Sequence, residues 1–526
     1  MTDALPIAII GAGPQGLAAA AQLLERGIEP LVFERGAAAG AAVTDWHDVR
    51  MFSEWPELVD GPARRLLEGA GQEIPASGFP TGAEWASDYL VPLASALGSR
   101  VRVGATVTGV ARSGRDRLVD AGRAEAPFEV QVTNADGSEE RIIARAVLDA
   151  SGTWSQPNPA GAAGLPALGE RAAAADGLIS YRIPMETEAD ALAGKHVVVI
   201  GSGHSASHAV IRLAALVERA PGTRVEWLIR RGTPSGLASE NDQLPERGAL
   251  GGRAAQTVES GAVTQVHGFR TAAFESAADK LTIVGEDATR ITDVDHVIAL
   301  TGFRPDTSFL SELRVSLDPS LEAVADLAEQ IDPNIHSCGT VRASGVVQLA
   351  QPEPDFYIVG AKSYGRAPTF LALTGYEQVR SIVAELAGDH AAALRNELVL
   401  PESGVCGGAG DFGDAGSCCT PAAASPQLIE LAPNLTAATQ LIQLQAASAA
   451  SSCCGSASAE QAATEQAPAA ASCCSSATAE SAEPAASSCC SAPAAEVAAP
   501  ASAASCCSPA GAQSIELGAR PDTVNV

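Results

Sequence analysis

The chain has 526 residues, a length that suggests about three or four domains. It carries 34 Lys and Arg against 62 Asp and Glu, and its net charge of −28 argues against nucleic acid or an anionic membrane as a partner. No apolar run approaches the roughly 18 residues of a membrane-spanning helix, and Asp3 stands where a signal peptide would carry basic residues. We therefore expect a soluble, cytoplasmic protein.

The twelve cysteines divide the chain into two parts. Cys338 is the only one before residue 400, and the other eleven lie in the C-terminal tail. This distribution is typical of a cysteine-poor cytosolic enzyme core with a separate cysteine-bearing segment, and not of a disulfide-rich secreted protein.

The first motif is a strand, a glycine-rich turn and a helix close to the N-terminus. The apolar run 7–10 fits a buried parallel strand, and an Ala-rich helix-forming run follows at 17–24. Between them, Gly11 makes the tight turn, Gly13 lets a pyrophosphate approach the backbone, and Gly16 lets helix and strand pack closely. The helix N-terminus then offers free N–H groups and a positive dipole end to the phosphates.

The next apolar run, at 30–33, ends in Glu34 and Arg35. Glu34 stands at about the distance expected for the acid that binds a ribose hydroxyl of a dinucleotide. A turn of this kind so near the start of the chain is typical of enzymes that hold the ADP half of FAD there. We predict that the three glycines, Glu34 and Arg35 bind FAD; the alternative is an ordinary glycine turn of an α/β protein.

A loop with Trp46, Arg50 and Trp55 follows this unit, and it either covers the flavin or packs as ordinary surface. Further strands are expected at 101–110, 128–132 and 141–148. The small residues and prolines of 149–159 then indicate that the chain leaves the first domain.

A second dinucleotide motif starts with a buried strand at 195–200. Gly201, Gly203 and Ala206 repeat the glycine spacing at the start of a helix that extends to about residue 218. The next strand ends in Arg230 and Arg231 in place of an acid, and guanidinium groups pair bidentately with a 2′-phosphate. We therefore predict that these five residues bind NADPH; the alternative is that the arginines are solvated at a strand end.

The first domain then resumes with a strand at 295–300, a last strand at 356–360 and a closing helix at 367–386. We predict an α/β fold with two nested Rossmann-like domains and a disordered tail. The expected boundaries are an FAD domain in two parts, 1–160 and 291–400, an NADPH domain at 161–290, and the tail at 403–526.

With both glycine turns, the SGTWSQP turn and the TGFRPD turn, the core resembles flavoproteins with two dinucleotide-binding domains, above all the flavin-containing monooxygenases. Segments such as VRMFSEW, SCGTVR, VGAKSYGRAPTF and TGYEQVR are similar to FAD/NADPH monooxygenases found with bacterial arsenic-resistance genes. The resemblance spans residues 1 to about 406. It implies the same FAD and NADPH ligands, with Gly360 approaching the flavin ring. The F-x-G-x-x-x-H motif of flavin monooxygenases is missing before the second turn.

The resemblance implies an FAD- and NADPH-dependent oxidoreductase, foremost a monooxygenase. It would act through a C4a-hydroperoxyflavin on a soft nucleophile such as sulfur, nitrogen or trivalent arsenic, with a link to arsenic resistance. Two alternatives stay open: an NADPH-dependent thiol or metalloid reductase that uses tail cysteines, and a metalloid-sequestering protein on a flavoprotein core. A reductase needs a dithiol near the flavin, and the core contains only Cys338.

The motifs do not fix a catalytic residue or the oligomeric state. Tyr364, Arg366 and Arg304 are candidates for contacts with a small-molecule substrate or the nicotinamide, and Arg304 fits equally well a role in pinning its turn. Cys338 is either a buried small residue or, beside His336, an active-site thiol.

From about residue 403 the composition changes to Ala, Ser, Gly and Pro, which cannot bury a core, although a docking helix is conceivable at 426–447. The tail carries five adjacent cysteine pairs. Thiolates select soft ions, so we predict a flexible trap for a thiophilic metal or metalloid; the alternative is that these cysteines are merely tolerated. The predicted ligands are Cys418, Cys419, Cys453, Cys454, Cys473, Cys474, Cys489, Cys490, Cys506 and Cys507.

Overall fold

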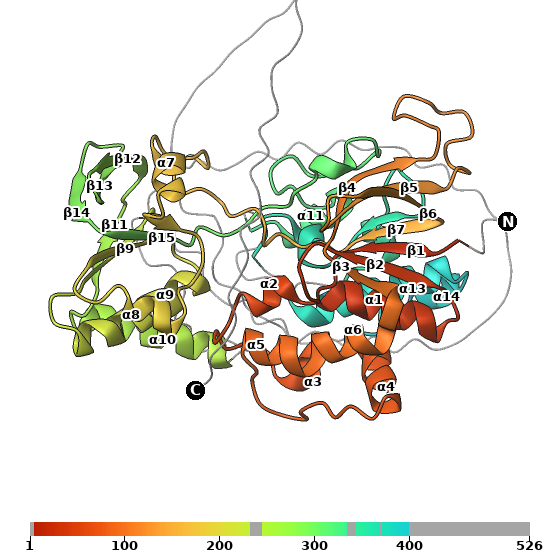
Figure 1. Cartoon of the computed structure of the whole chain (residues 1–526), viewed down its shortest axis with the longest axis horizontal. Coiled ribbons are helices and arrows are strands. Elements are labelled where there is room, and N and C mark those ends of the chain that lie inside the picture. The colour runs from red at the N-terminus through yellow and green to blue at the C-terminus, as the bar shows by residue number, and fades with distance from the viewer. Residues whose placement is uncertain (1–4, 232–244, 334–342, 369, 399–526) are drawn as a thin grey trace, which may run out of the picture. The chain divides into compact units, whose positions relative to one another are not determined.

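Two parallel sheets of five strands each organise the computed structural model (Figure 1). The structure describes residues 5–231, 245–333, 343–368 and 370–398. Cys338, the cysteine pairs of the tail and the helix expected at 426–447 therefore lie outside the described residues. Across the described ranges, no helix is both long and apolar enough to cross a membrane.

The first sheet joins strands from both ends of the described chain. Its order is β16 (Phe356–Ile358), β7 (Ala146–Asp149), β1 (Ile7–Ile10), β2 (Pro30–Glu34) and β3 (Val101–Val103). All four pairings are parallel, and the central strand β1 is buried along its whole length. Helices α1 (Pro14–Glu25) and α13 (Ala372–Leu386) pack against each other. The predicted α/β class with an interrupted first domain is thereby confirmed.

The second sheet is also parallel. Its order is β11 (Thr264–His267), β10 (Arg224–Ile229), β9 (His196–Ile200), β15 (His296–Ala299) and β8 (Ile179–Ser180). Helix α9 (His204–Arg219) follows the central strand β9, and α10 (Pro245–Glu259) packs against α9. The second glycine turn thus joins β9 to α9, as the first joins β1 to α1.

Two antiparallel sheets of three strands accompany the parallel ones. One consists of β4 (Ala105–Arg112), β5 (Phe128–Asn134) and β6 (Glu139–Ala144), and the other of β12 (Thr271–Ala277), β13 (Lys280–Gly285) and β14 (Arg290–Val294). The short helices are α2 (Ala41–Thr44), α3 (Trp55–Leu58), α4 (Gly61–Gly69), α5 (Gly82–Trp85), α6 (Val91–Leu97), α7 (Glu170–Ala175), α8 (Glu186–Asp190), α11 (Ala325–Ile331), α12 (Val346–Leu349) and α14 (His390–Leu394). A π-helical turn at Ala86–Leu90 and 3₁₀ turns at Gly98–Arg100, Ser308–Leu310 and Gly360–Tyr364 complete the described elements.

The structure corrects three strand predictions. The strand expected at 141–148 is two strands, β6 in an antiparallel sheet and β7 in the first parallel sheet. We expected the strand at 295–300 to return to the first domain, but β15 pairs with β9 and β8 and belongs to the second sheet. The single strand expected at 101–110 is two strands, β3 in the first parallel sheet and β4 in an antiparallel one, with Gly104 at positive φ between them. An apolar run signals a buried strand, but it does not identify the sheet that the strand joins.

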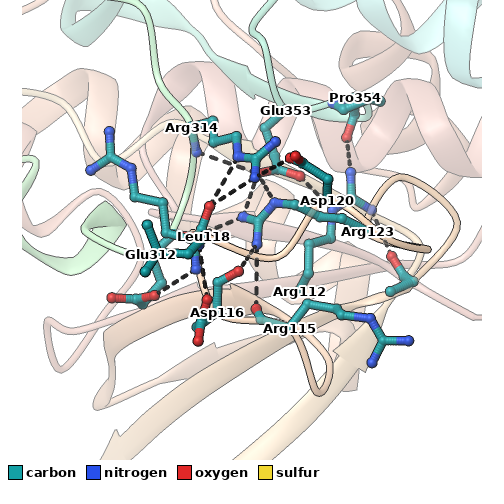
Figure 2. A network of polar contacts seen from close by, with 12 residues as sticks. Arg112, Arg115, Asp116, Leu118, Asp120, Arg123, Glu312, Arg314, Glu353 and Pro354 are labelled. Carbon is teal, nitrogen blue, oxygen red and sulfur yellow. Dashed lines mark hydrogen bonds and ion pairs between the residues drawn. The ribbon is translucent and has the colours of Figure 1, made fainter. Parts of the chain in front are cut away.

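A buried ion network ties the loop after β4 to the turn before β16 (Figure 2). The Glu353 carboxylate, 1 % exposed, accepts hydrogen bonds from Arg112 Nε at 2.7 Å and from Arg123 Nη2 at 2.6 Å. The Arg314 backbone N–H donates to the same carboxylate at 3.3 Å. Burial by itself would raise the pKa of Glu353, but the hydrogen bonds from the two guanidinium groups hold it below its usual range. The network fixes two segments more than 200 residues apart to each other.

We expect Glu353→Gln to lower the free energy of unfolding by about 3–5 kcal/mol, because two guanidinium groups would stay buried beside a neutral amide. Urea denaturation followed by circular dichroism measures the change. Glu25→Gln is the control, since Glu25 pairs with Arg65 at the surface at 2.9 Å and such a pair contributes at most about 1 kcal/mol. Equal losses in the two variants would contradict this role for the network.

Candidate functional site

The first glycine turn has the geometry of a dinucleotide cradle. Gly11 has φ +99°, and a Cβ there would lie 2.7 Å from the Ala150 carbonyl oxygen. A Cβ on Gly16 would overlap the Gly11 carbonyl oxygen, so α1 lies directly against the end of β1. A Cβ on Gly13 would meet no atom within 4 Å. The turn therefore needs two glycines for its own fold, and the third leaves free space beside the helix N-terminus.

The second turn repeats this arrangement. Gly201 has φ +135°, and a Cβ there would overlap the Leu300 carbonyl oxygen, while a Cβ on Gly203 would again meet nothing within 4 Å. Ala206, in the first turn of α9, is fully buried. No described side chain caps the N-terminus of either α1 or α9, so both helices present unpaired backbone N–H groups, the usual setting for an anion.

A cavity of about 620 Å³ extends from the first glycine turn to the start of α9, and none of the predicted NADPH residues lines it: Gly201, Gly203, Ala206, Arg230 and Arg231. It runs from Gly11 and Gly13 past the turn 150–154 to the first turn of α9, and Gly360 and the N-terminus of α13 line it as well. Residues far apart in the sequence thus face one space. FAD fits these residues, because the position where a Cβ on Gly13 would stand is open and the adjoining helix end is uncapped.

Glu34 and Arg35 both line this cavity at the end of β2. The Glu34 carboxylate accepts hydrogen bonds from the backbone N–H groups of Ala12, at 2.8 Å, and Gly36, at 2.7 Å. These two bonds fix its orientation beside the glycine turn. A carboxylate oxygen accepts more than one hydrogen bond, so each retains capacity for a ribose hydroxyl.

A buried ion pair lies just behind the cavity wall. Lys362 Nζ donates to Asp149 Oδ2 at 2.6 Å and to Ser151 Oγ at 3.0 Å, and both charged side chains are almost completely buried. The Ser151 backbone N–H and hydroxyl in turn donate to Asp149 Oδ1. Lys362 Nζ also lies 4.4 Å from the centre of the Phe309 ring. These contacts hold the cavity-lining turn that begins at Ser151.

Aromatic rings form another part of the lining. Trp154 contacts Phe303 with ring centroids 4.7 Å apart and Trp46 at 6.1 Å, and its Nε1–H donates to Asp45 Oδ2 at 3.0 Å. Of the loop residues noted in the sequence, Trp46 and Arg50 line the cavity, whereas Trp55 is buried and does not.

Sequence reasoning missed a cluster of three rings at the first turns of α9. Phe52 contacts His204 edge to face, with ring centroids 5.2 Å apart, and lies nearly parallel to His208, with centroids 6.1 Å apart. All three line the cavity. Burial and the positive charges of Arg212 and Arg253 lower the pKa of His208 to about 4. A signal was present, since a spacing of four residues places two histidines on the same face of a helix that follows a glycine turn.

The two arginines predicted to select a 2′-phosphate lie at the end of β10. Arg230 Nη1 donates to the Ala162 carbonyl at 2.8 Å. Burial and the charges of Arg231 and Arg270 lower the pKa of Arg230 from its usual value, so three guanidinium groups gather at this strand end. A cluster of positive charges of this kind favours the binding of an anion. Arg230 also has a structural role, because it donates to the Ala162 carbonyl.

The structure separates the catalytic candidates from the cavity. Arg304 donates to Asn158 Oδ1 at 2.8 Å and to the Gly164 carbonyl, so it pins the turn, as the alternative held. Tyr364 is fully buried, and Arg366 is exposed and pairs with Glu322 at 2.7 Å. None of the three lines the cavity. Cys338 and the ten predicted tail ligands lie outside the described residues, and the described ones include no cluster suited to a metal ion.

A family model described as pyridine nucleotide-disulphide oxidoreductase matches residues 8–330. A search of curated proteins finds no match. The bacillithiol disulfide reductase Bdr of Bacillus cereus is 24% identical, with 73% of this chain and 99% of that one covered and a TM-score of 0.54. The cadaverine monooxygenase DfoA of Erwinia amylovora, solved with FAD, is 13% identical, with 76% and 98% covered and a TM-score of 0.54. At these identities, the two structures establish a shared fold.

Proposed function

The chain belongs to the pyridine nucleotide-disulphide oxidoreductase family, and we propose that within it the protein is an NADPH-dependent flavin monooxygenase acting on a soft nucleophile. The membership confirms the predicted class, an oxidoreductase that uses FAD and NADP(H). We propose a monooxygenase within this class, and the observation that supports the choice is the composition of the cavity lining.

The lining supports oxygen transfer over disulfide reduction. A disulfide reductase of this type needs a dithiol beside the flavin. The cavity lining includes glycines, aromatic rings, two histidines and charged side chains such as Glu34, Arg50 and Arg182, and it contains no cysteine among the described residues. In the sequence, Cys338 is the sole thiol before residue 400. Oxygen transfer by a flavin needs no side-chain nucleophile, so this lining suffices for it.

The residues of the first turn would hold FAD. The uncapped N-terminus of α1 and the open space at Gly13 suit its pyrophosphate, and the oriented Glu34 carboxylate suits a ribose. Gly360 lines the same cavity. When bound, FAD supplies the transfer of electrons from NADPH to dioxygen. The protein's own part is to hold both nucleotides against one space and to keep water out with the Trp46, Trp154 and Phe303 rings.

Oxygen labelling tests this function. With NADPH, ¹⁸O₂ and a thioether or a trivalent organoarsenical, we expect one labelled oxygen atom in the product for each NADPH consumed. A chain that lacks 403–526 should keep this activity. Without oxygen, NADPH oxidation driven by a disulfide, and lost on removal of the tail, would instead establish the thiol reductase.

Two glycine variants test the first turn as the FAD site. We expect Gly13→Ala to fold normally but to bind FAD about 10- to 100-fold more weakly, because the added methyl group occupies the space of the pyrophosphate. Gly16→Ala should lower the stability of the apoprotein itself, because its Cβ overlaps the Gly11 carbonyl oxygen. Flavin content and thermal unfolding of the two apoproteins separate these effects. Unchanged FAD affinity in Gly13→Ala would contradict the assignment.

Nucleotide selectivity tests the arginines. We expect Arg231→Gln to weaken NADP⁺ binding about tenfold or more, with little change for NAD⁺, since only the former carries the 2′-phosphate. Isothermal titration calorimetry measures both affinities. Arg290→Gln is the control, because Arg290 lies on β14 and pairs with Glu275 on β12. A parallel loss for both nucleotides would show that Arg231 does not read the phosphate.

A further inference from the structure

Phe52, His204 and His208 line the cavity, but the proposed function gives none of them a role in binding a nucleotide. We call these three rings the stack. His204 is the first residue of α9, and His208 follows one helical turn later. By helix geometry the two Cβ atoms are about 5–6 Å apart. Phe52 comes from the loop between α2 and α3 and contacts α9. The neighbouring ion pair of Asp48 and Arg212, at 2.6 Å, joins the same loop to α9. The stack is therefore a fixed part of the cavity wall.

The surroundings of His208 leave one of its nitrogens without a partner. Its Nε2 atom is buried, and no described residue forms a hydrogen bond with it. Burial disfavours a positive charge on the ring, as do Arg212 and His204 on α9 and Arg253 on α10, whereas Asp48 on the loop favours it. A buried nitrogen without a partner costs free energy, so its persistence beside a cavity indicates that something else supplies the partner.

A dinucleotide diphosphate would change this balance. The uncapped N-terminus of α9 and the open space at Gly203 suit such a group, which brings two negative charges to within about a helical turn of His208. An opposite charge within about 4–6 Å favours the charged form of a histidine. The imidazole would then gain a proton from solvent on a ring nitrogen and pass from neutral to positively charged.

We propose that His208 takes up a proton from solvent when the diphosphate of NADP(H) binds at the N-terminus of α9, and that the resulting imidazolium is part of the nucleotide site. The inference rests on the proposed function, because it needs NADP(H) at this turn. It assigns a binding role to a residue that no glycine-turn motif specifies.

Proton uptake is measured by isothermal titration calorimetry of NADP⁺ into the FAD-loaded full-length chain at pH 6, in two buffers of different ionisation enthalpy. If the nucleotide raises the pKa of His208 by about two units from about 4, wild type takes up about half a proton more than His208→Gln. The 2′-phosphate also titrates in this range, but equally in both proteins, so the difference isolates His208. At pH 8 the two should bind NADP⁺ with the same affinity, whereas at pH 5 wild type should bind about tenfold more tightly than the variant.

His390→Gln is the matched control. His390 also titrates, since its hydrogen bond with Glu385 raises its pKa, but it lies on α14 and does not line the cavity. This variant should take up protons as wild type does. His208→Asn serves as a second variant if His208→Gln does not bind NADP⁺ at pH 8.

The outcomes separate the inference from the proposed function. NADP⁺ binding with equal proton uptake in wild type and the His208 variants would overturn the inference and leave the proposed function standing. Loss of the uptake in His390→Gln as well would also overturn the assignment to His208. No binding of NADP⁺ by wild type at any pH would overturn the proposed function together with the inference.

Discussion

The close approach of a helix to a strand end is the constraint on which the site depends. At Gly16 of α1 there is no room for a Cβ, because the Gly11 carbonyl oxygen already fills that position; at Gly201 the Leu300 carbonyl oxygen, just after β15, does the same for the end of β9. The approach brings the first turns of α1 and α9 against the carboxyl ends of the central strands β1 and β9. Unpaired N–H groups then point into space that Gly13 and Gly203 keep open. The two predicted nucleotide sites share this geometry and differ in the residues beside it, Glu34 at the first turn and Arg230 and Arg231 at the second.

A second requirement is that the strands of the interrupted first sheet pair correctly, β16 with β7. The chain leaves the first sheet after Asp149 and returns to it only with β16, so the two parts must find each other across the whole second domain. The buried pair of Asp149 and Lys362 joins them next to the cavity, and the Glu353 network joins them at another place. The outgoing and returning segments also hold each other directly, since the Asn158 side chain donates to the Thr301 carbonyl and the Thr301 hydroxyl to the Asn158 carbonyl. Buried ion pairs are costly when one partner is missing, which makes them sensitive to correct assembly.

The local part of this organisation could be predicted from the sequence. In both motifs the strand, turn and helix follow one another directly in the chain, so the glycine spacing predicted them, although the carbonyl oxygens against Gly11 and Gly201 come from distant segments. The partner of β15 could not be predicted, because a buried parallel strand has the same apolar pattern in either sheet. The environments of Arg304 and Tyr364 could not be predicted, because they depend on residues far away in the sequence. An arginine that stabilises a turn also has the same sequence pattern as one that binds a ligand. Phe52 was missed for the same reason, since only the fold brings it to α9.

The chemistry in such a protein is set where the two nucleotide sites meet and not by the turns that hold the nucleotides. The turns and the uncapped helix ends suit any reaction that passes electrons between a dinucleotide and a flavin. A thiol pair in the wall would direct those electrons to a disulfide. An aromatic wall without thiols would leave dioxygen as the acceptor of those electrons, and the substrate nucleophile would then need no covalent bond to a side chain. The described lining has Trp46, Trp154 and Phe303 in one part and Phe52 against two histidines in another, together with charged side chains such as Glu34 and Arg35. The rings limit the access of water, which is the contribution that the proposed oxygen transfer would require from the protein.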